Sequence, residues 1–296
     1  MKNKYLVMLA LIIIIGAALR TVNIGWGLDK QQPWITEIED EPYGYAAAFQ
    51  IKPLEGKLDP GAWAMQKGTF YYEIVGTINN ILESTYTKSV IFPKINSKGE
   101  EFYYNAIFAR SINMLFFMGN ILFIYLLCIS LFKKKSIGIL AAFNYSIFAH
   151  EIAFNNLITG DIATSFFTLG ALYFSVYSYK KAKPGKLWLA ALFSGFATAA
   201  KFTGIITTIP IAVSFFLLFR KKTFKRHIIN IGQIVIGFLS GFIIGMPSVI
   251  FKFNEFINGL KVQQYYQTGE FLPGEDQLPR FFYYFTNVFH YGLGLV

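Results

Sequence analysis

Four carboxylates stand close together near the N-terminus, within the segment ITEIEDEPYGYA. Glu37, Glu39, Asp40 and Glu41 occupy four of five consecutive positions in a chain of which only 15% of the residues are charged. A positioned carboxylate can remove the proton from an attacking hydroxyl group. A run of acids is also typical of a solvated surface, the interpretation that we favour for Glu37 and Glu39. Asp40 and Glu41 are therefore the first candidates for chemistry.

Four more ionisable residues lie where long apolar runs meet polar segments, namely Arg110, Glu151, Asp161 and Lys201. Ionisable groups at membrane depth cost free energy, so they tend to mark a functional cavity. Charges at a membrane rim can also simply extend into the lipid headgroups, and this alternative stays open for Arg110 and Glu151. Mixed charges around one pocket suit a reaction in which a hydroxyl loses its proton and an anionic phosphate leaves.

The composition is that of a membrane protein. Of the 296 residues, 54% are apolar and 18% are aromatic. Several apolar runs approach the length of about 20 residues that spans a bilayer. The single cysteine, Cys128, excludes an intrachain disulfide framework and a thiolate metal cluster. The net charge of +10 does not indicate nucleic acid as a partner, because it is concentrated between the apolar runs.

Basic residues gather in four groups that contain no acid. These groups hold 14 of the 27 Lys and Arg residues, and they are Lys2 with Lys4, residues 133–135, residues 180–186 and residues 220–226. Positively charged loops face the cytoplasm. We therefore expect a multi-pass protein of the cell membrane with a cytoplasmic N-terminus. Every carboxylate is then expected on, or at the rim of, the extracytoplasmic face.

The apolar runs predict about seven transmembrane helices in a single all-α domain, residues 1–296. The runs are residues 5–19, 106–132, 137–154, 162–179, 187–219 and 228–251. The fifth run is long enough for two crossings, with a bend at residues 199–204. This order leaves two exterior loops, residues 20–105 and residues 252–290. For the first run, a cleaved signal peptide is the alternative.

The first exterior loop contains an aromatic-rich stretch, AWAMQKGTFYYEIVGTINNIL, that suits a helix lying in the membrane interface. Familiar catalytic motifs are missing from the sequence. HEIAF, residues 150–154, has Phe154 where the zinc motif H-E-x-x-H requires its second histidine. The sequence also contains no phosphate loop and no dinucleotide-binding fingerprint. A nucleotide-binding αβ domain is therefore not encoded in these residues.

Three passages resemble the membrane glycosyltransferases of the GT-C fold that use polyprenyl-phosphate sugars, especially the protein O-mannosyltransferase and aminoarabinose-transferase branch. DEPYGYAAAFQI, residues 40–51, is similar to the Asp-Glu motif that opens the family's first exterior loop. QKGTFYYEIVG, residues 66–76, resembles its lysine-containing juxtamembrane segment, with Lys-Gly-Thr where many relatives have Lys-Pro-Pro. Residues 155–175 and 194–211 are similar to its paired middle helices. The resemblance implies a GT-C-like helical bundle whose large first exterior loop carries juxtamembrane helices.

The resemblance also implies roles for six residues. The catalytic carboxylates would be Asp40 as the base, Glu41 and Asp161, and the donor-phosphate ligands would be Lys67, Arg110 and Lys201. Crowded carboxylates are also the oxygen ligands that a divalent cation takes. The same three carboxylates are therefore the candidates for a metal site, while the requirement for a metal stays open.

The activity implied by the resemblance is transfer of a hexose or pentose from a polyprenyl-phosphate-linked donor, with inversion. The acceptor would be a hydroxyl or amine of a protein or lipid at the extracytoplasmic face, with membrane lipids as surroundings. A transporter or lipid flippase and a noncatalytic membrane scaffold are the alternatives. A transporter predicts acids at mid-span, whereas Asp161 lies at the end of a predicted helix. We also expect a C-terminal truncation relative to the family, since the apolar segment 281–296 ends before completing a span.

Overall fold

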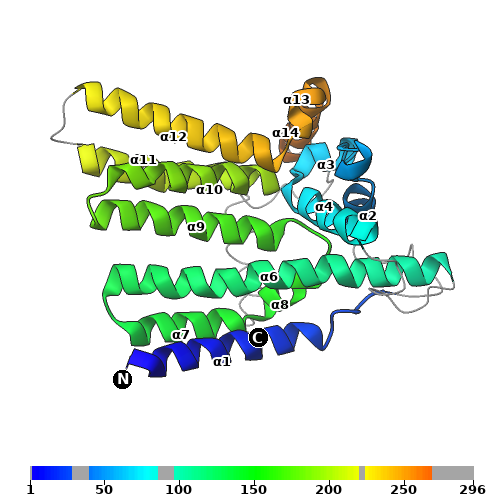
Figure 1. Cartoon of the computed structure of the whole chain (residues 1–296), viewed down its shortest axis with the longest axis horizontal. Coiled ribbons are helices and arrows are strands. Elements are labelled where there is room, and N and C mark those ends of the chain that lie inside the picture. The colour runs from blue at the N-terminus through cyan, green and yellow to red at the C-terminus, as the bar shows by residue number, and fades with distance from the viewer. Residues whose placement is uncertain (1, 29–39, 86–96, 220–223, 269–296) are drawn as a thin grey trace.

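The computed structural model describes residues 2–28, 40–85, 97–219 and 224–268, which fold into helices. In these ranges the strand-like pairing is limited to an isolated bridge between Lys52 and Lys57. Figure 1 shows long helices running side by side in a bundle. They are α1 (Lys2–Thr21), α6 (Lys98–Phe132), α7 (Lys135–Ser146), α9 (Asp161–Lys180), α10 (Leu187–Ala200), α11 (Thr208–Phe219) and α12 (Phe224–Gly245). The predicted all-α membrane fold is confirmed.

Short helices from both expected exterior loops, together with one from the end of the sixth predicted run, gather at one end of the bundle (Figure 1). They are α2 (Asp40–Phe49), the 3-10 helix η1 (Pro53–Glu55), α3 (Ala62–Lys67), α4 (Phe70–Thr85), α13 (Ser248–Phe251) and α14 (Phe253–Thr268). The N-terminal end of α1 and the basic turn between α6 and α7 lie at the opposite end (Figure 1). One end of the bundle therefore carries the segments that the sequence predicts as exterior loops, and the other end carries the basic segments that it predicts as cytoplasmic.

The longest helix, α6, begins and ends at residues suited to these positions. The Ser97 side chain accepts a hydrogen bond from the backbone N–H of Glu100 at 3.2 Å, as an N-cap does. At the other end, Lys133 has a left-handed conformation, and its N–H donates to the Ile129 carbonyl at 2.9 Å. The helix starts at Lys98 rather than at residue 106, so it extends from the bundle into the predicted exterior loop.

Length and apolar composition identify three described helices as candidate membrane spans, with up to one more. The three are Lys4–Thr21 of α1, Lys98–Phe132 of α6 and His227–Gly245 of α12. The additional candidate is α7 together with α8 (Ala149–Asn155), which meet at an angle of 57°. The expected third span is therefore broken rather than straight. Helices α9, α10 and α11 share the bundle (Figure 1), and the count of seven spans stays a prediction.

A buried arginine donates hydrogen bonds to backbone carbonyl groups at the break between α7 and α8. Arg20 on α1 is fully buried, and its Nη1 donates to the carbonyls of Ser146 at 2.9 Å and Gly16 at 3.0 Å. Ser146 ends α7, and the last carbonyls of a helix lack partners within the helix. The guanidinium also lies 3.3 Å from the centre of the Phe117 ring. Arg20, at the expected start of the exterior loop, thus belongs to the interior of the bundle.

Helices α10 and α12 approach each other through small residues. A Cβ atom at Gly237 would lie 2.6 Å from the carbonyl oxygen of Trp188, and one at Gly241 would lie 2.2 Å from that of Leu192. Glycines at four-residue spacing allow such close packing of helices in lipid. Ile236, elsewhere on α12, is 66% exposed, as expected for a side chain that faces lipid.

The hydrophobic core next to the short helices fixes them to the bundle. Its buried members include Tyr71 of α4, Phe102 and Ala109 of α6, and Ile158 in the connection before α9. The Tyr71 hydroxyl donates to the Ala109 carbonyl at 2.8 Å. A buried hydroxyl without such a partner would cost free energy, so this bond fixes the position of α4 against α6.

Candidate active site

Two carboxylates that are distant in the sequence each begin a helix at the same end of the bundle. Asp40 is the first residue of α2, and Asp161 is the first residue of α9. The N-terminus of a helix carries partial positive charge, which stabilises an ionised carboxylate. Each carboxylate also pairs with a lysine: Lys67 contacts Asp40, and the Lys201 Nζ donates to Asp161 Oδ1 at 2.5 Å. Both pairs are partly exposed and therefore accessible to a substrate.

The two ion pairs border a polar cavity of about 600 Å³. Its walls come from α3, α4, α14 and the connection that follows α10, and they include the side chains of Gln66, Gln263 and Gln264. Tyr72 also lines this cavity. Burial, and to a smaller extent the charges of Asp161 and Asp40, raise the pKa of Tyr72, so its hydroxyl stays protonated and can donate a hydrogen bond.

A second, more apolar cavity of about 640 Å³ adjoins the first. Its apolar wall is formed by Trp26, Ala149, Ile152, Ala153, Phe154 and Leu157. Four residues line both cavities: Asp40, Thr159, Asp161 and Lys201. We call these four the junction residues, because the polar and the apolar cavity meet at them.

The backbone after Lys67 comes into direct contact with the end of α10. Gly68 has a φ of +117°, and a Cβ atom there would lie 2.7 Å from the carbonyl oxygen of Ala200. The next residue, Thr69, donates its N–H to the Ala199 carbonyl at 2.8 Å. Glycine is the residue that tolerates this conformation and this approach. Proline is fixed near −65°, so a Lys-Pro-Pro sequence would require a different path here.

The backbone before Asp161 approaches the same point. A Cβ atom at Gly160 would lie 2.8 Å from the carbonyl oxygen of Ala200. Ala200 immediately precedes Lys201, whose side chain pairs with Asp161. The segments that carry the two cavity lysines and Asp161 therefore converge on one carbonyl group. This contact explains how residues far apart in the sequence come to line one cavity.

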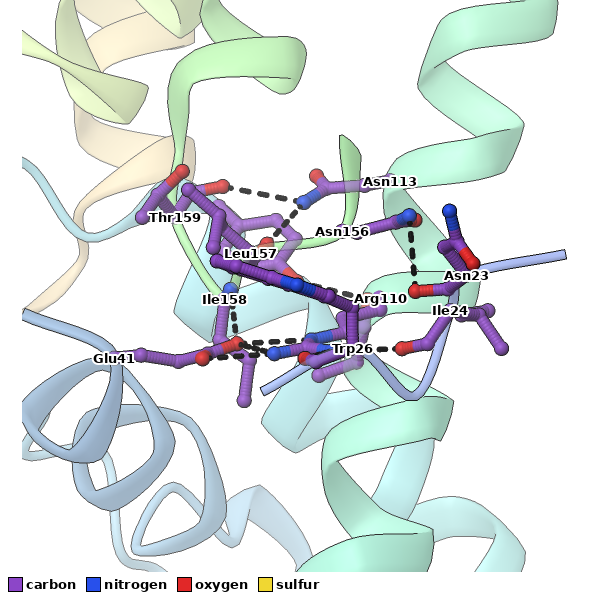
Figure 2. A network of polar contacts seen from close by, with 12 residues as sticks. Asn23, Ile24, Trp26, Glu41, Arg110, Asn113, Asn156, Leu157, Ile158 and Thr159 are labelled. Carbon is purple, nitrogen blue, oxygen red and sulfur yellow. Dashed lines mark hydrogen bonds and ion pairs between the residues drawn. The ribbon is translucent and has the colours of Figure 1, made fainter. Parts of the chain in front are cut away.

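Glu41 and Arg110 form a buried ion pair outside both cavities (Figure 2). Their side chains are 1% and 0% exposed. Arg110 donates from Nη2 to Oε1 and Oε2 of Glu41 at 2.7 and 2.8 Å, and from Nε to Oε1 at 2.9 Å. Burial raises the pKa of Glu41, while Arg110 and the backbone amide of Ile158 act in the opposite direction.

This buried pair connects three segments of the chain around the junction residues. Arg110 Nη1 donates to the carbonyls of Ile24 and Trp26 at 2.7 and 2.8 Å, and the Ile158 N–H donates to Glu41 Oε1 at 3.1 Å. Figure 2 shows these contacts meeting between α2, α6 and the connections that follow α1 and α8. Glu41 is adjacent to one junction carboxylate, and Ile158 lies shortly before the other. The pair thus holds the backbone on which both carboxylates stand.

The six predicted site residues fall into two groups. Four line the polar cavity and two are buried beside it: Asp40, Lys67, Asp161 and Lys201 in the first group, Glu41 and Arg110 in the second. An ionisable residue at membrane depth indicates a functional position but does not reveal its partner. The sequence therefore identifies all six without separating those that face a ligand from those that hold the backbone.

The other charges considered from the sequence lie elsewhere. Glu151 accepts a hydrogen bond from the Tyr145 hydroxyl at 2.8 Å. Glu37 and Glu39 lie outside the described residues. Of the three carboxylates considered for a cation, Asp40 and Asp161 line the same cavities and pair with lysines, whereas Glu41 is buried against Arg110. Among the residues described, no group of three or more His, Cys, Asp or Glu could hold a metal ion.

The cavity also contains polar residues for which the sequence gives no signal. Gln66, Gln263 and Gln264 are uncharged; Gln66 begins the passage that resembles the family's juxtamembrane segment but has no role assigned there, and Gln263 and Gln264 match no motif. They face one cavity because α14 packs against α3, a contact between the two expected exterior loops. Thr159 lies at the junction because the chain turns there between α8 and α9.

A buried acid on α4 makes the stability of the protein depend on pH. The pKa of Glu73 is raised from 4.5 to about 8, chiefly by burial and to a smaller extent by nearby Asp59, while Thr69 acts in the opposite direction. The folded chain therefore binds more protons than the unfolded chain between these two values, so stability falls as pH rises through this window. We expect Glu73→Gln to raise the melting temperature at pH 8 and to flatten its pH dependence. Thermal unfolding from pH 5 to 9 measures this, with Glu83→Gln on the same helix as the control. A pH profile identical to that of the wild type would contradict the prediction.

A model of the family described as dolichyl-phosphate-mannose-protein mannosyltransferase matches residues 103–250, half of the chain, and the chain belongs to this family. Together with the all-helical fold, this match identifies the class of protein, a membrane glycosyltransferase of the GT-C type. The match includes Arg110, Asp161 and Lys201, whereas Asp40 and Lys67 precede it. No curated protein and no solved structure matches the chain.

Proposed function

We propose that the protein transfers a sugar from a polyprenyl-phosphate-linked donor to a hydroxyl or amine of its acceptor, with inversion and with Asp40 as the base. The observation that carries this proposal is the junction of the two cavities at Asp40, Thr159, Asp161 and Lys201. Group transfer requires a place where two substrates meet beside a proton acceptor. The family supports a protein as the acceptor.

The two cavities differ in the way that a lipid-linked sugar requires. The apolar cavity suits the polyprenyl chain, because its wall is built largely from aliphatic and aromatic side chains. The donor phosphate then lies at Lys201, which lines both cavities, with Lys67 on the wall of the polar one. The sugar extends from this phosphate into the polar cavity, beside Asp40.

The proposed reaction is a single displacement at the anomeric carbon. The acceptor oxygen or nitrogen forms a bond to that carbon while the bond to the phosphate oxygen breaks and its electron pair leaves with the phosphate. The acceptor proton passes to Asp40. A transition state with oxocarbenium character is favoured by nearby carboxylates, and Lys201 stabilises the charge that gathers on the leaving phosphate. One displacement gives inversion.

The distribution of basic residues supports an extracytoplasmic site. The N-terminal end of α1 and the basic turn at residues 133–135 lie at the end of the bundle opposite the short helices (Figure 1). The Asp40–Lys67 and Asp161–Lys201 pairs lie on the side of the short helices. Because positively charged loops face the cytoplasm, this arrangement favours a cytoplasmic N-terminus and an active face on the other side of the cell membrane.

Removing the junction lysine tests this proposal. We expect Lys201→Ala to lower the rate of transfer by about 10²-fold, because one electrostatic contact to the leaving group is lost. The change in folding stability should stay within about 1 kcal/mol, since the ion pair is partly exposed. The assay uses the full chain in liposomes with polyprenyl-phosphate-mannose and a Ser/Thr peptide, and it measures released polyprenyl phosphate together with the glycosylated peptide.

Lys57→Ala is the matched control, because Lys57 is an exposed lysine of the first exterior loop that lines neither cavity. Wild-type turnover in Lys201→Ala would contradict the proposed role. Movement of the donor lipid across the bilayer by the wild type, without release of polyprenyl phosphate, would favour the flippase alternative. A wild-type chain that does neither would favour the scaffold.

A further inference from the structure

We propose that Gln66, Gln263 and Gln264 bind the hydroxyl groups of the transferred sugar and determine which sugar the site accepts. This inference rests on the proposed function, because it assigns a ligand to part of the polar cavity. It adds three uncharged residues to a site that the charged residues alone define.

The chemistry of the three side chains matches a sugar. An amide side chain provides two N–H donors and a carbonyl acceptor, and a sugar hydroxyl is both donor and acceptor. The three amides share one cavity with the carboxylates and lysines proposed for the reaction. Within the described part of the chain, no hydrogen bond engages these three side chains. They are therefore available to a ligand in the cavity.

Helix α14 holds two of the glutamines in a fixed place. At the start of α14, Lys252 pairs with Asp59 of the first exterior loop. A Cβ atom at Gly259 would lie 2.7 Å from the carbonyl oxygen of Met65, so α14 rests directly on the backbone of α3. Ser248 Oγ lies 3.3 Å from the Met65 sulfur. Gln263 and Gln264 are thus presented by a docked helix.

The same helix is packed against the segment that carries the junction lysine. Phe256 of α14 contacts the ring of Phe202 edge to face, with a centroid distance of 5.7 Å, and the ring of Phe242 at 6.0 Å. Phe202 directly follows Lys201. The two glutamines and the proposed phosphate ligand are therefore positioned by one continuous set of contacts, as recognition of a sugar and its phosphate together requires.

A site built to hydrogen-bond particular hydroxyls discriminates against a sugar that presents them in another direction, because its own polar groups are then left unpaired. Each hydrogen bond lost in this way typically weakens binding by roughly two- to tenfold. Mannose and glucose differ only in the direction of one hydroxyl. The ratio of the affinities for the mannose-bearing and the glucose-bearing donor therefore reports on recognition of that hydroxyl by the three amide side chains.

The experiment compares binding of polyprenyl-phosphate-mannose, polyprenyl-phosphate-glucose and polyprenyl phosphate to the full-length protein in nanodiscs without acceptor. We expect Gln263→Ala and Gln264→Ala to lower affinity for the sugar-bearing lipids by about tenfold, to change the mannose-to-glucose ratio, and to leave polyprenyl phosphate binding unchanged. Lys261→Ala is the control, because Lys261 is an exposed residue of α14 that lines neither cavity. Gln263→Leu and Gln264→Leu, which keep more of the side-chain volume, replace the alanine variants if those fail to fold.

Three results would overturn the inference. An equal loss of affinity for all three lipids would mean that the glutamines support the fold or the phosphate. Unchanged donor affinity, together with an increased acceptor KM of the same variants in the liposome transfer assay, would assign them to the acceptor. Failure of the wild-type chain to bind any of the three lipids would remove the donor assignment as well. A wild type that binds the sugar lipids, with the expected losses in the glutamine variants, but transfers no sugar in the liposome assay would refute the proposed function alone.

Discussion

Asp40→Asn should lower the rate of sugar transfer by about 10² to 10⁴-fold, the usual contribution of a positioned general base. Asparagine keeps the shape of the side chain but cannot take the proton of the acceptor. Asp40 is the carboxylate for which this loss is expected because it lines both cavities and is the first residue of α2. Release of polyprenyl phosphate and formation of glycosylated peptide, measured together in liposomes, provide the rate.

Glu55→Gln makes the same chemical change at an exposed acid that lines neither cavity, and it should retain wild-type turnover. Binding of polyprenyl-phosphate-mannose to Asp40→Asn shows whether the donor site is intact. Full turnover in Asp40→Asn would remove Asp40 from the reaction. If Asp161→Asn lost activity in the same experiment while Asp40→Asn kept it, Asp161 would be the base.

Arg110→Ala should destabilise the folded protein by about 3 to 5 kcal/mol, because it leaves the Glu41 carboxylate buried without its counter-charge. It also removes the hydrogen bonds to the carbonyls of Ile24 and Trp26. The backbone around both junction carboxylates then loses its support, so transfer should fall together with stability. Denaturant unfolding in detergent micelles measures the free-energy change.

Lys67→Ala is the matched comparison, since it also removes the basic partner of a carboxylate. The Asp40–Lys67 pair is partly exposed, and such pairs contribute about 0 to 1 kcal/mol. Replacing both partners in Glu41→Leu/Arg110→Met should recover part of the stability lost in Arg110→Ala, because no unpaired charge remains. If Arg110→Ala cost no more than Lys67→Ala, the buried pair would not hold the site.

The helical architecture follows largely from apolar length in the sequence. The candidate spans α1, α6 and α12 overlap three predicted runs, although α6 begins before residue 106 and α12 ends at Gly245 rather than at residue 251. The bend after residue 199 corresponds to the extended Lys201 between α10 and the 3-10 helix Phe202–Thr207. The break between α7 and α8 was beyond prediction, because it is stabilised by Arg20 from a different helix. The interface stretch of the first loop likewise forms two helices, separated at Gly68, rather than one.

The sequence predicts the charged residues of the candidate site but not the uncharged ones. A cost for burying ionisable groups makes Asp161 and Lys201 conspicuous in an apolar sequence, and the local acid cluster does the same for Asp40. Which residue a charged side chain pairs with depends on packing between distant segments. The sequence therefore does not distinguish Arg110, which lies in a buried ion pair, from the lysines that line the cavity. The glutamines of α14 are neither costly to bury nor regularly spaced, and they become visible only when α14 is placed on α3.

The close approach of Gly68 and Gly160 to the carbonyl of Ala200 has a consequence for the evolution of such enzymes. The spacing between positions 67, 161 and 201 is set by main-chain atoms, which are the same whatever side chains stand at those positions. Substitutions there can alter the chemistry of the leaving group while the scaffold keeps its shape. Replacement of either glycine, by contrast, would push the main chain away from Ala200 and displace the neighbouring lysine or aspartate, so the scaffold constrains these two residues through their backbone contacts.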